Sequence, residues 1–64
     1  MEKKYLNELR KQKNFTQEDL AKKLNMSKGA IGMYETGQRL PSLKTAIKIA
    51  EIFDTSVENI IFSK

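Results

Sequence analysis

The 64-residue sequence contains no cysteine, no histidine and no tryptophan. Without cysteine it forms neither disulfides nor thiolate metal sites, and without histidine it lacks the side chain that most often acts as a general base. It has no apolar run near the roughly 18 residues of a membrane span, and its charged N-terminal segment lacks the apolar stretch of a signal peptide. We therefore expect a cytoplasmic protein that is not an enzyme, needs no metal or cofactor, binds no small-molecule ligand and enters no membrane.

Charge and size narrow the class of protein further. Twelve Lys and Arg residues oppose eight Asp and Glu residues, which gives a net charge of +4 at pH 7 and a pI near 9.5. A basic balance fits a polyanionic partner such as nucleic acid, although many solvated domains carry a similar excess. A chain this short holds one domain, which we place at residues 1–64, and it buries only about 60% of its unfolded surface.

Apolar residues recur at helical spacing along the chain, and no stretch alternates apolar and polar residues as a half-buried strand would. Ser and Thr residues stand where helices would begin, because their side chains can cap the first free amides. The spacing predicts an all-α bundle of five helices, placed over about 2–13, from Thr16, from Ser27 to near Gly37, over about 43–54, and from Ser56.

The last two predicted helices each carry an apolar stripe. In the fourth, the side chains expected to face the core are Leu43, Ala46, Ile47, Ala50 and Phe53. In the fifth, they are Val57, Ile60 and Ile61. Stripes of this kind place helices around one shared core.

The connection between the second and third predicted helices is only two or three residues long, at Asn25 and Met26. Such a short connection makes the two helices cross steeply, and the small side chain of Ala21 suits their point of contact. Asn25 suits the left-handed backbone that a tight turn often needs, because Asn tolerates that conformation better than most residues. These features predict a helix-turn-helix unit.

The segment TQEDLAKKLNMSKGAIGMYETG resembles the phage-repressor family of Cro/CI or xenobiotic-response-element type. The segments LNELRKQKNFTQ before it and PSLKTAIKIAEIFDTSVENII after it are similar to that family's first helix and its last two helices. The family usually has glycine where Asn25 stands. The resemblance implies a compact five-helix lambda-repressor-like domain that binds double-stranded DNA as a transcriptional regulator, most often a repressor. Two alternatives stay open: an antitoxin with a toxin partner, and a protein-interaction domain that binds no DNA.

The third predicted helix has one apolar and one outward face. At 100° per residue, Ala30, Ile31 and Tyr34 fall on the core side. In this architecture the opposite face enters the major groove, so the predicted base contacts are Lys28, Gly29, Gly32 and Met33. The Lys28 ammonium can donate to a guanine edge, and the alternatives are a phosphate contact or a solvated charge. Met33 can pack on a thymine methyl, and the alternative is an incidental exposed side chain.

The two glycines on that face are unusual in a helix, since each costs about 1 kcal/mol relative to Ala. Gly29 and Gly32 lie three residues apart. Either they let the helix backbone approach the bases closely, or they make few base contacts and DNA shape contributes more to recognition. The second interpretation is slightly favoured.

Phosphate contacts are expected at helix ends, because helix N-termini attract anions, and at nearby cations. The helix starts supply Thr16, Gln17 and Ser27. Gln17 faces inward by its helical angle, yet its amide could reach past the helix end. The family resemblance adds the loop residues Thr36, Gly37 and Gln38. Charge and position add Arg39 and Lys44, for which a solvated charge is the alternative.

Arg10 lies beside Leu6 and Leu9 on the inner edge of the first predicted helix. A half-buried guanidinium needs a partner, and Glu35 at the edge of the third helix offers the carboxylate. We expect a structural ion pair between Arg10 and Glu35, similar to a pair common in the family.

Family members commonly bind two-fold operators as dimers, which predicts a weak homodimer. Ile52 and Phe62 point away from the apolar stripes of their predicted helices. Exposed apolar residues of this kind can form a self-association surface, so both are expected at the dimer interface. The alternative is that they pack on their own subunit.

Overall fold

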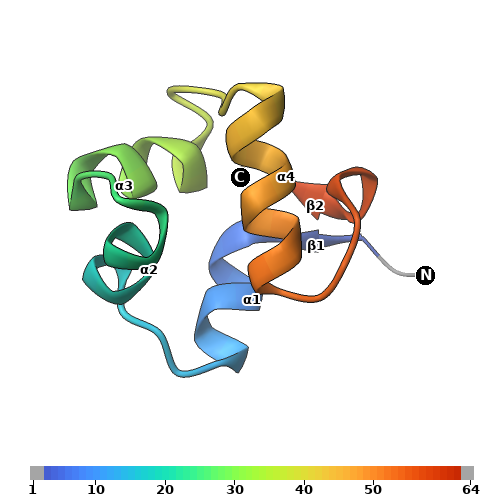
Figure 1. Cartoon of the computed structure of the whole chain (residues 1–64), viewed down its shortest axis with the longest axis horizontal. Coiled ribbons are helices and arrows are strands. Elements are labelled where there is room, and N and C mark those ends of the chain that lie inside the picture. Colours follow the sequence, from blue (N-terminus) through green and yellow to red (C-terminus); the bar gives the residue numbers. More distant parts are fainter. Residues whose placement is uncertain (1–2, 63–64) are drawn as a thin grey trace.

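The computed structural model describes residues 3–62, which are mostly helical (Figure 1). Within this range there are four α-helices, α1 (Leu6–Gln12), α2 (Gln17–Leu24), α3 (Lys28–Thr36) and α4 (Leu43–Ile52). A 3-10 turn, η1 (Val57–Asn59), and two short strands, β1 (Lys4–Tyr5) and β2 (Ile60–Ile61), complete the order of elements. In Figure 1, α2 and α3 form one side of the molecule, the strand pair lies on the other side, and α4 stands between them.

The core draws side chains from all four helices and from β2. The largest fully buried side chains are Leu6, Leu20, Ile31, Tyr34 and Ile49. Across residues 3–62, each helix is too short or too polar to cross a bilayer. The helices are held by this shared core, because helices of seven to ten residues are marginal in isolation.

Three helices begin at capping side chains. The hydroxyl of Thr16 accepts from the N–H of Asp19 at 3.0 Å, and that of Ser27 accepts from the N–H of Ala30 at 3.1 Å. Ser42 does the same for the first turn of α4. The caps predicted at Thr16 and Ser27 are therefore confirmed, and a cap of this type is worth about 1 kcal/mol.

The turn between α2 and α3 has the predicted left-handed residue. Asn25 has φ 57° and ψ 45°, and the N–H of Met26 then donates back to the carbonyl of Ala21 at 2.9 Å. Ala21 is 3% exposed, so its small side chain lies within the packed contact between the helices. The short turn thus fixes the orientation of α3 relative to α2.

The predicted fifth helix is wrong. After Ser56 the chain makes the single turn η1 and then β2, which pairs in parallel with β1, Ile60 beside Lys4. The Ser56 hydroxyl caps no helix and accepts instead from the side-chain amide of Asn59 at 2.9 Å. β-Branched side chains favour extended backbone, and β1 supplies the ladder that satisfies it.

The first helix is correspondingly shorter than predicted. Its expected start is occupied by β1, and the helix itself begins at Leu6. The glutamate at position 8 accepts from the N–H of Tyr5 at 3.0 Å and so closes the first turn of α1. The all-α prediction therefore holds for the helical body and misses the two-residue strand pair.

The apolar stripe predicted for α4 is partly wrong. Leu43 is 71% exposed and Ile47 is 44% exposed, whereas Ile49 is fully buried. The buried face runs through Ala46, Ile49, Ala50 and Phe53. The predicted and the observed stripes share Ala46, Ala50 and Phe53. They differ in that Ile49 faces the core in place of Leu43 and Ile47.

Arg10 and Glu35 lie together and join α1 to α3. The Nε of Arg10 is 2.6 Å from Oε2 of Glu35, and the two side chains are 12% and 7% exposed. The same guanidinium donates through Nη1 to the carbonyl of Phe15 at 2.9 Å. The arginine thus ties the carboxylate of α3 to both α1 and the loop after it.

We expect Arg10→Met to lower the free energy of unfolding by about 3 kcal/mol, because it leaves a nearly buried Glu35 carboxylate without its cation. Urea denaturation followed by circular dichroism measures this change. The matched control is Lys11→Met, which removes a charge from an exposed position of the same helix and is expected to change stability by less than about 0.5 kcal/mol. Equal losses for the two variants would contradict the role of the ion pair.

Substitutions of Asn25 test the role of its left-handed backbone in the turn between α2 and α3. We expect Asn25→Ala to destabilise the protein by about 1 kcal/mol, because the left-handed backbone conformation is less favourable for alanine than for asparagine. Asn25→Gly is expected to be at least as stable as the wild type, because glycine adopts this conformation freely. Thermal and urea unfolding of the two variants give the comparison. A glycine variant that loses as much as the alanine variant would show that Asn25 acts through its side chain.

Candidate nucleic-acid interface

The third helix has one face fixed in the core. Ala30, Ile31 and Tyr34 are 5%, 0% and 2% exposed, so they set the rotation of α3 about its axis. The helix begins at the Ser27 cap and ends at Gly37, which has φ 80° in the left-handed region. The face opposite the buried residues is therefore turned outward, with its two ends exposed and its middle half-buried.

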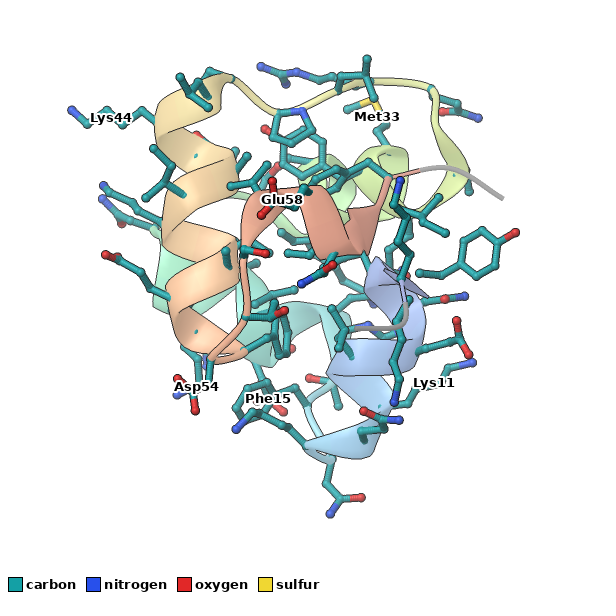
Figure 2. All side chains as sticks on the ribbon, turned by 90° about the vertical axis from the view of Figure 1, so that its right-hand side faces the viewer. Lys11, Phe15, Met33, Lys44, Asp54 and Glu58 are labelled. Carbon is teal, nitrogen blue, oxygen red and sulfur yellow. The ribbon has the colours of Figure 1, made fainter. Side chains whose placement is uncertain are left out.

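That outward face carries the four positions predicted to contact bases. Lys28 and Gly29 are exposed, while Gly32 and Met33 are half-buried. In Figure 2, Met33 lies at the end of the molecule where the chain leaves α3 for α4. The structure thus brings the four positions together on one surface, with Met33 less exposed than the sequence interpretation assumed.

The glycines on this face meet no demand of the fold. A Cβ added to Gly29 would come within 4.0 Å only of the Ser27 hydroxyl, and one added to Gly32 would lie 3.8 Å from Nε2 of Gln17. Both distances are ordinary contacts, and positive φ among the described glycines occurs only at Gly37. Nothing in the packing of the described residues therefore requires glycine at 29 or 32.

A contact that the sequence analysis missed lies beside Gly32. Nε2 of Gln17 donates to Oε1 of Glu35 at 3.0 Å, so the same carboxylate that binds Arg10 also holds the first side chain of α2. Gln17 had been placed inward by its helical angle and outward by its expected phosphate contact. Combining that inward angle with the predicted position of Glu35 could have revealed the hydrogen bond.

The start of α2 is a reciprocal capping box. Thr16 accepts from Asp19, and the N–H of Thr16 donates to Oδ2 of Asp19 at 2.8 Å. This hydrogen bond from the Thr16 backbone lowers the pKa of the Asp19 carboxyl below its ordinary value. The local carboxylates of Glu18 and Asp19 make this helix end less positive, so a phosphate here would depend on the N–H groups and the Gln17 amide.

Four more of the predicted phosphate contacts lie at the end of α3 and in the loop after it. Thr36, Gly37, Gln38 and Arg39 are all exposed. The Thr36 hydroxyl donates to the carbonyl of Gly32 at 3.2 Å, which turns it back onto the helix. The Arg39 guanidinium lies 5.9 Å from the centre of the Tyr34 ring, which keeps it near α3.

Lys44 and Ser27 complete the set. Lys44 is exposed in the first turn of α4, and Figure 2 shows it projecting away from the body of the protein. Ser27 is exposed, and although its oxygen caps α3, its hydroxyl hydrogen can still donate to a phosphate. The candidate phosphate residues thus lie at the starts of α2, α3 and α4, at the end of α3 and in the loop after it.

The residues predicted at a dimer interface lie elsewhere. Ile52 and Phe62 are half-buried, and both pack against the core of their own chain. This arrangement leaves less apolar surface at these two positions than the predicted dimer contact assumed.

Comparison with known proteins places these features in a family. A family model described as helix-turn-helix matches residues 6–60. An uncharacterised HTH-type transcriptional regulator of Methanocaldococcus jannaschii is 53% identical over 47 residues, which cover 73% of this chain and 71% of that protein. One from Archaeoglobus fulgidus is 42% identical over 55 residues, covering 86% and 78%. YqaE of Bacillus subtilis, also named an HTH-type transcriptional regulator, is 41% identical over 56 residues, covering 88% and 48%.

No solved structure matches the chain. The family match runs from the start of α1 to the start of β2, so it includes the whole α2–turn–α3 unit and the core that supports it. The resemblance stated from the sequence is confirmed, and the chain belongs to the helix-turn-helix family.

Proposed function

We propose that this chain binds double-stranded DNA in a sequence-specific way and regulates transcription, with α3 in the major groove. We further propose that it acts as a repressor on a two-fold operator, where a weak homodimer occupies half-sites about 34 Å apart. Support comes from the family and from the relatives, which are named transcriptional regulators. We assign no enzymatic activity, because the chain has neither histidine nor cysteine and its proposed interface is built for binding.

The division of α3 into two faces carries this proposal. Its core face holds Ala30, Ile31 and Tyr34, and its other face is left free for a partner. An α-helix about 10–12 Å across fits a major groove about 12 Å wide.

The proposed contacts divide by chemistry. Lys28 offers an ammonium to a guanine edge, and Met33 offers a methyl to thymine, while Gly29 and Gly32 face the bases with backbone alone. The phosphate contacts are assigned to Thr16, Gln17, Ser27, Thr36, Gly37, Gln38, Arg39 and Lys44. Contacts to phosphate position the protein, and contacts to bases select the sequence.

Selection of bound duplexes from random DNA tests the function directly. We expect the recovered duplexes to share a motif, and binding to that motif to fall about 10³–10⁵-fold between 50 and 200 mM salt if 6–10 phosphates are contacted. Lys28→Ala is expected to weaken binding at least about tenfold, the effect of losing one good base contact. A pool without enrichment, bound equally at both salt concentrations, would contradict DNA recognition.

The matched control for Lys28 is Lys22, an exposed lysine on α2 outside the proposed interface. Lys22→Ala removes the same charge and is expected to change affinity for the selected duplex by less than about twofold, since a surface charge that contacts no phosphate is largely screened. Equal losses for the two alanine variants would show that general charge, and not the position of Lys28, drives binding.

The two glycines give a separate prediction about how α3 reads DNA. Gly29→Ala and Gly32→Ala should each raise the free energy of unfolding by about 1 kcal/mol, because both sites have room for a Cβ. We expect each variant to keep its affinity for the selected duplex within about threefold, a change below 1 kcal/mol. A loss beyond about tenfold in a stabilised variant would show instead that the groove closes directly on the helix backbone.

A further inference from the structure

Three large apolar side chains lie exposed at the start of α4. Leu40 and Leu43 are each 71% exposed, and Ile47 is 44% exposed. Leu43 and Ile47 lie four residues apart, one turn of α4, on the same helix face, and Leu40 lies in the loop three residues before α4 begins. We call Leu40, Leu43 and Ile47 the α4 apolar patch.

Neither the fold nor the proposed DNA contacts explain this patch. The core of α4 lies on its other face, through Ile49 and Phe53. The neighbouring DNA contacts, Arg39 and Lys44, are assigned to phosphates, and a phosphate gains nothing from a leucine beside it. A surface patch of large apolar residues is typical of a protein interaction site.

The charges around the patch define its partner. Arg39 precedes Leu40, Lys44 follows Leu43 and Lys48 follows Ile47, and all three cations are exposed. Glu51, one turn beyond Ile47, is also exposed and is the single carboxylate of α4, so the cations around the patch outnumber it by three to one. A second copy of the chain would bring the same excess of cations against these, which opposes self-association through this surface. An acidic partner would meet them with opposite charge.

We propose that the α4 apolar patch binds an acidic amphipathic helix of another protein. The apolar residues of that helix, at spacings of three and four, pack on Leu40, Leu43 and Ile47, and its carboxylates lie beside Lys44 and Lys48. Electrostatic complementarity at the rim selects the acidic partner, and the apolar centre supplies affinity.

This surface overlaps the proposed phosphate contacts. Arg39 and Lys44 belong to both, so a bound acidic helix occupies cations that DNA needs. The partner therefore lowers the affinity for DNA by competition. This consequence, unlike the docking itself, rests on the proposed function.

Docking is tested without DNA. The probe is a fluorescein-labelled synthetic peptide of about 18 residues, or five helical turns, with Leu on one face and Glu on the other. The comparison peptide has the same charge, with Gln in place of Leu. By fluorescence anisotropy we expect the Leu peptide to bind at least about tenfold more tightly, since burial of even one leucine is worth that factor.

Protein variants locate the binding. The double variant Leu43→Gln/Ile47→Gln keeps helix-forming side chains at exposed positions, and circular dichroism checks that it stays folded. It is expected to bind the Leu peptide at least about tenfold more weakly than the wild type. Lys48→Glu should weaken binding more than Lys22→Glu, the same charge change on α2.

Three results would overturn the docking proposal. The first is equal binding of the two peptides, and the second is an unchanged affinity in the Leu43→Gln/Ile47→Gln variant. The third is a dimer in sedimentation that this variant converts to monomer, because the patch would then bind a second copy.

A competition experiment tests the consequence for DNA. The Leu peptide should displace the selected duplex from the wild type and not from the Leu43→Gln/Ile47→Gln variant. If no duplex is selected, the proposed function fails while the peptide titrations still decide the docking. If the peptide binds at the patch without displacing DNA, docking stands and the competition is refuted.

Discussion

The arrangement of the first three helices depends on the carboxylate of Glu35. This group on α3 accepts from Arg10 of α1 at 2.6 Å and from Gln17 of α2 at 3.0 Å, with the glutamate side chain only 7% exposed. Removing a single partner of such a pair leaves a charge in a poorly solvated place, which costs far more than losing a surface contact. Any change in the angle of α3 must break one of these bonds, so the ion pair and the Asn25 turn together hold the helix in one orientation.

The same arrangement orients the proposed interface on α3. Gln17, held by Glu35, borders the bare surface of Gly32, so the fold places a polar amide where α3 itself offers none. A small domain has about 5 kcal/mol of stability, and two glycines in a helix remove about 2 kcal/mol of it. The buried contacts on the other face of α3 and its hydrogen bonds to α1 and α2 therefore offset the low helix propensity of its two glycines.

Local signals in the sequence predicted the helix starts and the turn, because a cap or a left-handed residue acts within a few positions. Thr16, Ser27 and Asn25 are such cases. The strand pair could not be found in this way, since Lys4 meets Ile60 only after the whole chain has folded. Helical angles placed the faces of α3, where one apolar stripe is present. For α4 they gave the wrong buried face, because two apolar stripes overlap there and only packing against the core decides between Ile47 and Ile49.

Burial of Ile49 in place of Ile47 also determines which apolar side chains of α4 are exposed. By burying Ile49, the fold turns Leu43 and Ile47 to solvent on the part of α4 that carries Lys44. Apolar and cationic side chains then share one small surface, and any anionic partner with apolar groups uses both. In the proposed functions, DNA and an acidic helix both use Lys44, so they compete for it because their binding surfaces overlap. Regulation by an acidic protein therefore needs no second conformation of α3, which fits a helix fixed in place by a buried ion pair.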